Sequence, residues 1–211
     1  ACYHRGGDYF RHILMFVNGG IAVACADSID RRGELTGGFE DPRFEVVAYI
    51  NYLLYGDIVL DDPASLLYKE PDVNNDGTPL TVGDLIYMLR ILTGDALPHP
   101  KLQPLSDTVE LSVVDNVLTT VCRDSIGGIF LTLNSADSTD SVVALPDQEF
   151  ELVTPRMGER ARAVFWAGLD RVLRAIPPGR HRLLRIPEGA VLDTIQVCDY
   201  RGNLMLVEVV E

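Results

Sequence analysis

Apolar residues recur with helical spacing in three segments among the first hundred positions of the chain. Each segment opens with an acidic residue and stops at a glycine; the segments are DYFRHILMFVNGG from Asp8, EVVAYINYLLYGD from Glu45 and DLIYMLRILTGDA from Asp84. An acid in the first turn and a glycine after the last turn are boundary signals of helices. The pattern therefore predicts three sibling helices. Because apolar residues surround most of each helix, we expect each one to be covered on more than one side.

Beyond residue 104 the pattern changes to short runs rich in Val, Leu, Ile and Thr, separated by turn residues. Runs of this kind are typical of β-strands. The predicted strands are Thr108–Val114, Val117–Arg123, Gly128–Asn134, Ser141–Leu145, Glu149–Val153, Ala161–Ala167, Arg180–Ile186, Val191–Asp199 and Asn203–Val210. A hairpin turn is expected at Asp199–Asn203. Nine short strands in succession predict a sandwich.

The two patterns divide the chain into two predicted domains of an α+β protein. Residues 1–99 form a helical domain, residues 100–104 a proline-rich connector, and residues 105–211 an all-β jelly-roll or Ig-like sandwich. The proline-rich junction Pro98–Pro104 would span only about 20 Å when extended, at about 3.1 Å per residue. We therefore expect that the helical half does not reach a distant face of its own sandwich. Contacts between the halves would then join neighbouring molecules head-to-tail.

One segment ahead of the third helix, residues 72–84, has the spacing of a cation-binding loop. Oxygen-bearing side chains at loop positions 1, 3 and 5, followed by Gly77, match the first half of an EF-hand loop, and an acid closes it from the helix. The predicted calcium ligands are Asp72, Asn74, Asp76, Thr78 and Asp84. The closing acid stands at position 13 instead of 12. The alternative is a turn rich in Asn and Asp that caps the helix beginning near Val82.

The second repeat offers poorer chemistry for a cation. Glu34, Thr36 and Gly38 occupy its early ligand positions, while Glu45 keeps the closing position. The first repeat has almost no loop ahead of Asp8. The sequence therefore predicts one calcium site and leaves a second site open.

The D-x-N-x-D-G loop and the helix VGDLIYMLRILTGDALP, residues 72–97, resemble a dockerin repeat, and the likeness extends weakly over residues 1–100. The β half is similar to cohesins in its strand count, in IGGIFLTLN from Ile126, and in the strand pair around Cys198–Val210. Dockerins bind cohesins tightly and with calcium outside the cell. The resemblance therefore implies a dockerin-like half followed by a cohesin-like half, calcium dependence and an extracellular location.

Composition excludes several classes of protein. The formal charge of −13, from 18 Lys and Arg against 31 Asp and Glu, argues against nucleic-acid binding, which needs a basic face. No stretch approaches the roughly 20 apolar residues of a membrane span. The start at Ala1-Cys2 is expected of a processed secreted protein or of a trimmed chain. An oxidising location would favour two disulfides, paired Cys2–Cys25 and Cys122–Cys198.

No catalytic motif is evident, because the four histidines are scattered and no serine stands in a nucleophile motif. Trp166 is interpreted as a core aromatic, with a sugar-stacking platform as the alternative. Basic residues gather in the β half: Arg156, Arg160, Arg162, Arg171, Arg174, Arg180, Arg182 and Arg185. They predict solvated strand faces, or a surface complementary to the acidic half of another molecule.

The sequence therefore predicts an extracellular structural or adhesive subunit that assembles with copies of itself, head-to-tail in filament-like fashion. The first alternative is an anchoring module that attaches a different protein or enzyme at a cell surface through a cohesin or dockerin partner. A carbohydrate-binding module is the second. The terminal strand Leu204–Val210 could also add to the sheet edge of a neighbour, although an ordinary strand of the chain's own sandwich is the favoured interpretation.

Overall fold

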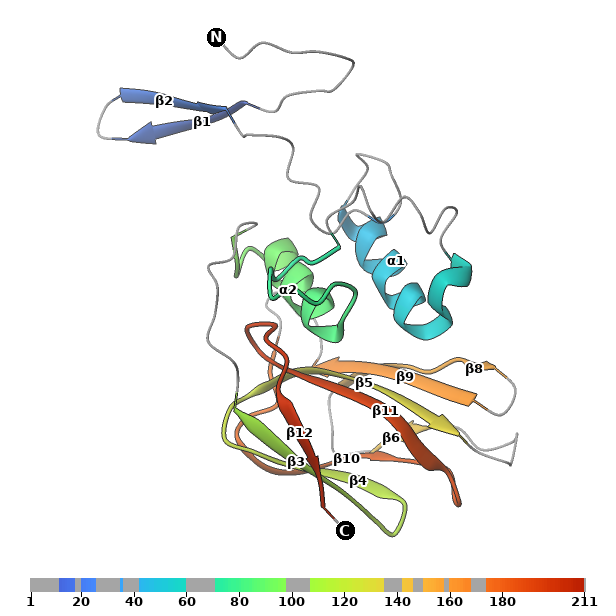
Figure 1. The fold of residues 1–211 in the computed structure, drawn as a ribbon. Helices are drawn as coiled ribbons and strands as arrows, with labels where there is room; N and C mark the ends of the chain where they lie inside the picture. The colour runs from blue at the N-terminus through green and yellow to red at the C-terminus, as the bar shows by residue number, and fades with distance from the viewer. Residues whose placement is uncertain are drawn as a thin grey trace.

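The computed structural model describes most of the sandwich and two of the three predicted helices. The described residues are 12–17, 20–25, 35, 42–59, 71–97, 107–134, 142–145, 150–157, 160–167 and 174–210. Figure 1 shows a layer of two helices above two stacked sheets. The connector at residues 100–104 lies outside the described residues.

The second and third repeats form helices, as predicted. Helix α1 spans Pro42–Tyr55 and continues into a short 3-10 helix, η1, at Gly56–Val59. Helix α2 spans Val82–Thr93. Gly94 ends α2 in the left-handed conformation, with φ of 79°, which glycine adopts without the steric cost of a Cβ.

The first repeat is a β-hairpin, so the helix predicted there is wrong. Strand β1, His12–Val17, pairs antiparallel with β2, Gly20–Cys25. The register places Val17 opposite Gly20, with Asn-Gly between them in the sequence. Asn-Gly between two apolar runs is the strongest short-range hairpin signal. Together with the β-prone Ile, Phe and Val residues, it outweighs the helical spacing.

The β half is a sandwich of two sheets, as predicted. The strands are β3 Thr108–Val114, β4 Val117–Cys122, β5 Ile126–Asn134, β6 Val143–Ala144, β7 Phe150–Val153, β8 Arg156–Met157, β9 Arg160–Ala167, β10 Gly179–Arg185, β11 Val191–Asp199 and β12 Leu206–Val209. One sheet has the order β12-β3-β4-β10-β6 and the other β11-β5-β9-β7, with β8 added on β9. The terminal strand β12 pairs parallel with β3 inside its own sandwich. All nine predicted strands have counterparts, and β8 is additional.

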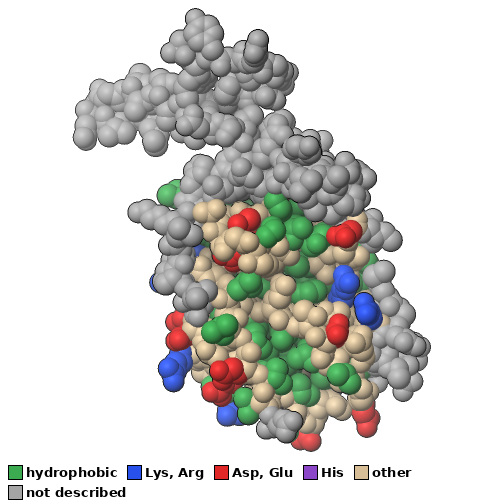
Figure 2. Space-filling view, in the orientation of Figure 1, with side chains coloured by type: hydrophobic (Ala, Val, Ile, Leu, Met, Phe, Trp, Pro, Cys, Tyr) green, Lys and Arg blue, Asp and Glu red, His purple; other side chains and the backbone are tan. Residues whose placement is uncertain are grey.

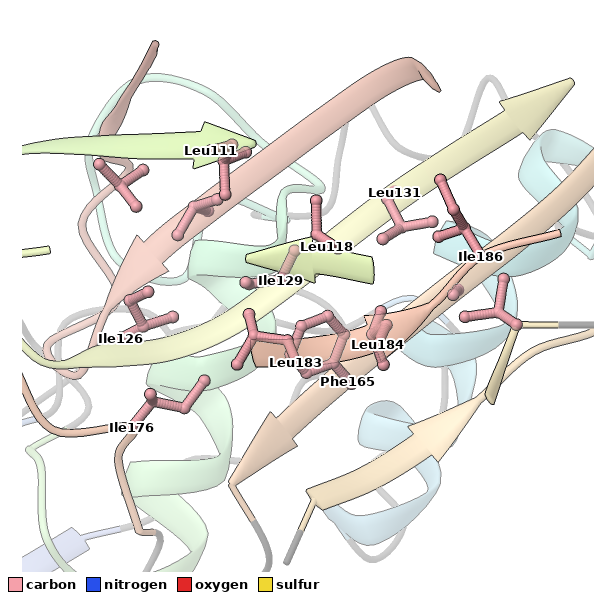
Figure 3. Close-up of a cluster of buried hydrophobic side chains, with 14 of the residues drawn as sticks. Leu111, Leu118, Ile126, Ile129, Leu131, Phe165, Ile176, Leu183, Leu184 and Ile186 are labelled. Carbon is pink, nitrogen blue, oxygen red and sulfur yellow. The ribbon is translucent and has the colours of Figure 1, made fainter. Parts of the chain in front are cut away.

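The space between the two sheets is filled by aliphatic side chains from both. Figure 3 shows Leu111 and Leu118 from one sheet meeting Ile129, Leu131 and Phe165 from the other. Alternation along each strand supplies these inward residues, because successive side chains point to opposite faces. This core explains why the strand pattern could be recognised in the sequence.

A second hydrophobic cluster joins the helices to the outer face of the sheet β11-β5-β9-β7. Tyr49 and Leu53 of α1 and Ile86 of α2 share it with Phe130 and Trp166 of the sheet. We expected contacts between the halves to join neighbouring molecules, because the connector is too short for the helices to reach a distant face of the sandwich. This contact instead forms within one chain, where the helices lie on the sheet directly beneath them (Figure 1).

Candidate functional site

Helix α2 approaches the sandwich closely because glycines line the contact. A Cβ added at Gly83 would lie 2.3 Å from the carbonyl oxygen of Gly202, in the turn between β11 and β12. Under the helix, a Cβ at Gly127 or Gly128 of β5 would come within 2.9 Å or 2.8 Å of Ile86. Contacts this short leave no room for any larger residue, so the helix packs as part of the protein core.

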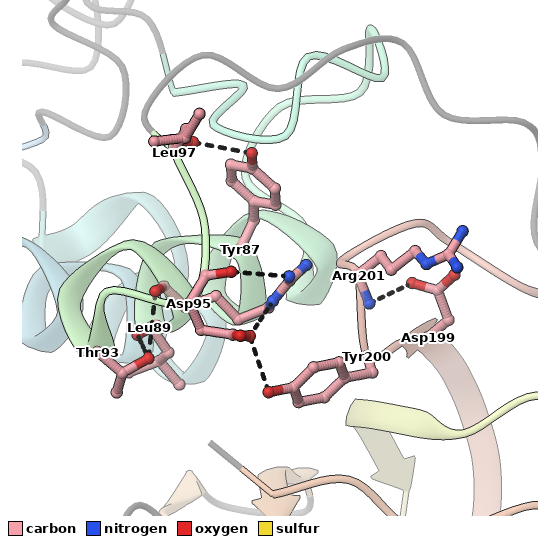
Figure 4. Close-up of polar contacts among 9 residues, drawn as sticks. Tyr87, Leu89, Thr93, Asp95, Leu97, Asp199, Tyr200 and Arg201 are labelled. Atoms are coloured by element: carbon pink, nitrogen blue, oxygen red, sulfur yellow. Dashed lines mark hydrogen bonds and ion pairs between the residues drawn. The ribbon is translucent and has the colours of Figure 1, made fainter. Parts of the chain in front are cut away.

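Polar contacts tie both ends of α2 to the sandwich. At its start, the Val82 amide donates to Oε1 of Gln196 on β11 at 3.2 Å, satisfying one of the free N–H groups of a helix N-terminus. At its end, Arg90 binds Asp95 at 2.8 Å, and the Tyr200 hydroxyl donates to the same carboxylate at 2.8 Å (Figure 4). Arg90 also lies over the Tyr200 ring, 4.9 Å from its centroid. The hydrogen bond from Arg90 holds the pKa of Asp95 below its usual value.

Helix α1 is held to the sandwich by one of the clustered arginines. Arg162 of β9 donates to the carbonyl oxygens of Leu53 and Leu54, at 3.4 Å and 3.3 Å. These carbonyls belong to the last turn of α1, where a cation complements the helix dipole. Part of the predicted basic cluster therefore stabilises the chain's own helix.

The loop with the predicted calcium ligands is closed by its own hydrogen bonds. The two carboxylate oxygens of Asp72 accept from the amides of Asp76 and Gly77, at 3.0 Å and 2.9 Å. Asp76 accepts from the Thr78 amide at 2.7 Å. A carboxylate has about four lone-pair positions, so Asp72 and Asp76 can still accept a cation. The Thr78 side chain is exposed.

Asn74, another predicted ligand, points toward the sandwich. Its Nδ2 donates to the carbonyl oxygen of Gly202 at 2.6 Å and to Asp76 at 2.9 Å, while its Oδ1 accepts from the Asp76 amide at 3.0 Å. The loop is thereby fastened to the β11–β12 turn.

Asp84, the predicted closing ligand, is fully buried and accepts four hydrogen bonds. Oδ1 accepts from the amides of Val73 and Asn74, at 2.7 Å and 3.2 Å. Oδ2 accepts from the amide and the hydroxyl of Thr81, both at 2.9 Å, completing a capping box at the start of α2. Burial raises the pKa of Asp84 to about 7, although the bonds from Thr81 and Asn74 oppose that rise.

The hydrogen bonds of the predicted calcium ligands leave only some of these residues able to bind a hard cation. Asp72 and Asp76 have free acceptor capacity, whereas the four donors around Asp84 use all of its positions. In the part of the chain that the structure describes, no three His, Cys, Asp or Glu residues are grouped so as to hold a metal ion. Calcium binding at this loop stays a prediction, and the capping alternative accounts for Asp84.

Each of the two helical repeats contains an equivalent hydrogen bond, from a loop amide to the acid near the start of its helix, which the sequence did not reveal. The Val73 amide donates to Asp84, and the Leu35 amide donates to Glu45 at 2.6 Å. Leu35 and Val73 are both buried in the cluster beneath the helices. The separations of 11 and 10 residues agree with the one-residue insertion in the third repeat. Glu34, Thr36 and Gly38 lie outside the described residues.

Two predicted disulfide partners are free thiols, so the Cys122–Cys198 pairing is wrong. Cys122 lies in the core between the sheets. Cys198 lies on the opposite side of its sheet, in the cluster with the helices, and contacts the carbonyl oxygens of Val82 and Gly128 at 3.7 Å and 3.6 Å. Burial raises the pKa of both thiols. Cys2 and the side chain of Cys25 lie outside the described residues.

Trp166 is buried beneath the helices, in agreement with its interpretation as a core aromatic. Its Nε1 has no hydrogen-bond partner within the described part of the chain. A sugar ring cannot stack on a side chain that the helices cover, so the residue proposed for carbohydrate binding is not available for that role. No helix in the described residues is long and apolar enough to span a membrane.

No protein-family model and no curated protein match the sequence. Among solved structures, the fold is similar to a non-cellulosomal cohesin from the hyperthermophilic archaeon Archaeoglobus fulgidus. That match has 14% identity and a TM-score of 0.32, and covers 48% of this chain and 84% of the cohesin. A chain of a type I cohesin–dockerin complex from Clostridium thermocellum matches at 13% identity and a TM-score of 0.28, covering 52% of this chain and 93% of that one.

Proposed function

We propose that this chain is a non-catalytic anchoring module that binds a partner protein of the cohesin or dockerin class and attaches it at a cell surface. The resemblance of residues 72–97 to a dockerin repeat and of the β half to cohesins supports this class of partner. An extracellular location belongs to the same proposal, as does a calcium ion at the loop of residues 72–84.

The observation that carries the proposal is the apolar outer side of α1. Phe44, Val47 and Tyr55 are 57%, 53% and 38% exposed, while Tyr49 and Leu53 on the other side are buried. Apolar residues around a whole helix indicate cover on both sides. The sandwich covers the inner side, and a partner protein would cover the outer one.

A stable support beneath this side favours binding. Arg162 holds the end of α1, and tight glycine contacts hold α2 beside it. A surface that keeps its shape when free loses little conformational entropy on binding.

A panel of purified cohesins and dockerins, tested by calorimetry against the full chain, would examine this function. We expect one class of partner to bind, and the double variant Phe44→Ser/Val47→Ser to bind at least tenfold more weakly. Val191→Ser is the matched control, because Val191 is an exposed apolar residue of β11, outside the helices. Absence of binding across the panel, or equal binding by the double variant, would contradict the proposal.

Self-assembly is the second candidate, through an exchange of the helices that pack on the sheet within one chain. The same contact could form between copies if they exchanged their helices, since domain swapping reuses existing interactions. Light scattering with and without EGTA would test this. A chain that is monomeric under both conditions excludes the filament.

A further inference from the structure

The sheet that the helices do not cover, β12-β3-β4-β10-β6, has an outer face with an ordered arrangement of charge. The register places side chains in rows across it. In one row Glu110 of β3 lies opposite Val121 of β4, which lies opposite Arg180 of β10. In the next row Ser112, Thr119 and Arg182 are aligned in the same way. Strand alternation puts both rows on the same face.

Basic side chains form a column on one side of this face. Arg180, Arg182 and Arg185 of β10 are all exposed. Their register partners on β4 are Val121, Thr119 and Val117. Among the described residues no ion pair neutralises these arginines. The column is therefore an unpaired basic stripe on a chain whose formal charge is −13.

Acidic side chains lie on the other side of the face. Glu208 of β12 is the register partner of Glu110 of β3, and both are exposed. Like charges directly opposite each other destabilise a strand pair. Nothing within the described residues offsets this repulsion with an ion pair. A basic group from another molecule would relieve it.

The strand between the two charged columns carries no charge on this face. On β4, Val117 and Thr119 are buried and Val121 is half-buried. In the row of Val117, the exposed Val114 lies on the β3 side, and Arg185 stands between Val117 and the exposed Val143 of β6. A centre without charge, flanked by charged and polar groups, is the usual anatomy of a protein interface.

We propose that a second copy of this chain docks on this face, related to the first by a two-fold axis that lies above the face, parallel to β4. Strands β3 and β10 each lie about 4.8 Å from β4, on opposite sides of it. Rotation about this axis therefore brings Glu110 of the second copy over Arg180 of the first, and the reverse contact follows from the symmetry. Both residues belong to the same row, so both contacts form at once.

The salt dependence of association follows from the charges. Copies with a formal charge of −13 repel each other at low ionic strength, where the Debye length is about 30 Å at 0.01 M. Near 0.15 M the range of this repulsion, set by the Debye length, falls to about 8 Å. Glu–Arg pairs in direct contact persist at this ionic strength. At 1 M salt the pairs weaken as well. The dimer is therefore tightest at intermediate salt, whereas apolar association would only strengthen as salt rises.

Sedimentation equilibrium of the full chain across these salt concentrations tests the proposal. We expect a closed dimer that Arg180→Glu or Glu110→Arg weakens at least tenfold. The double variant Glu110→Arg/Arg180→Glu restores the dimer, because each swapped residue meets its swapped counterpart. Mixing the two single variants also restores it, as a heterodimer. Arg160→Glu, an equal charge change on the other sheet, leaves the dimer unchanged.

A chain that stays monomeric at every salt concentration overturns the proposal. So does a dimer that is indifferent to Arg180→Glu, or a double variant that does not recover. Circular dichroism of each variant checks its fold; if one single variant fails to fold, Arg180→Gln or Glu110→Gln replaces it at the same position. An open series of oligomers would indicate the exchange of helices described above and would also overturn the two-fold dimer.

Discussion

Asn74 Nδ2 lies 2.6 Å from the carbonyl oxygen of Gly202, and this hydrogen bond joins residues 128 positions apart in the chain. It fastens the loop of the third repeat to the turn between β11 and β12. The loop, the helix that follows it and the sandwich therefore form one connected body.

Replacing Asn74 with alanine removes this bond and leaves the buried Gly202 carbonyl without its donor. We expect the free energy of unfolding to fall by about 1–3 kcal/mol. Urea denaturation measured in EGTA would show the change without any contribution from a cation. Thr78→Ala is the control in the same loop, because the Thr78 side chain is exposed. Equal stability of Asn74→Ala and wild type would exclude the fastening role.

Gly83→Ala should destabilise the protein although alanine is the better helix former by about 1 kcal/mol. The new Cβ would lie 2.3 Å from the carbonyl oxygen of Gly202, and overpacking of this kind costs about 1–3 kcal/mol. Thermal unfolding would measure it. Asn51→Ala, at a half-exposed position of α1, should leave the melting temperature unchanged or raise it. A stabilised Gly83→Ala variant would show that α2 does not lie against the turn.

The buried Asp84 carboxyl gives the metal-free protein a pH dependence. Burial raises its folded pKa to about 7, above an unfolded value of about 3.9. The folded state therefore holds more protons than the unfolded state between these values. The stability that the proton contributes is complete below about pH 4 and is lost as pH rises through about 7.

Urea denaturation in EGTA from pH 4.5 to 7.5 should show the free energy of unfolding falling by up to a few kcal/mol, at about 1.4 kcal/mol per pKa unit. Asp84→Asn should flatten this dependence, since asparagine cannot titrate. Glu151→Gln, which alters an exposed carboxyl of β7, is the control. A stability that rises with pH in both Asp84→Asn and wild type would contradict the assignment.

Cys122 and Cys198 should resist alkylation in the folded protein and react after unfolding. Both thiols are buried, and burial raises their pKa, so the reactive thiolate is scarce. Iodoacetamide labelling in native buffer and in guanidinium, followed by peptide mapping, would measure this. A disulfide-linked peptide containing Cys122 and Cys198 would refute the arrangement of the two sheets.

Calcium, if it binds as the sequence predicts, should raise the melting temperature by mass action. The double variant Asp72→Asn/Asp76→Asn should lose this response, because it removes the two carboxylates with free acceptor capacity. Thr78→Ala should keep it, since an EF-hand loop uses a backbone carbonyl at position 7. Calorimetric titration without heat, together with an unchanged melting temperature in millimolar calcium, would exclude the site.

The strands and two helices could be predicted because their signals are local. Alternation marks the strands, and acids and glycines mark the ends of the helices. The first repeat misled because Phe10, Ile13, Leu14 and Val17 have helical spacing, although the Asn-Gly that follows them is a turn signal, and the turn signal decided the outcome. In the loop, the sequence identified the oxygen-bearing residues. It could not show that Val73, Asn74 and Thr81 would donate hydrogen bonds to the Asp84 carboxylate and use its acceptor positions.

The packing of the helices on the sandwich depends on contacts between distant positions. Tyr200 and Asp95 are 105 residues apart, and no local pattern connects them. One signal was present: Gly127 and Gly128 stand inside an apolar strand, where glycine marks the close approach of another element. It indicated that something lies on this face, although not that the chain's own α2 does.

The parallel pairing of β12 with β3 has a mechanical consequence. Because the two strands run in the same direction, residue 107 at the start of β3 and residue 210 at the end of β12 lie at opposite ends of their ladder. Tension between these two points acts along the strands. It loads the pairs from Leu206–Thr108 to Val209–Leu111 together, in shear, instead of opening them one after another. The two strands are therefore connected in the direction in which a strand pair best resists a pull.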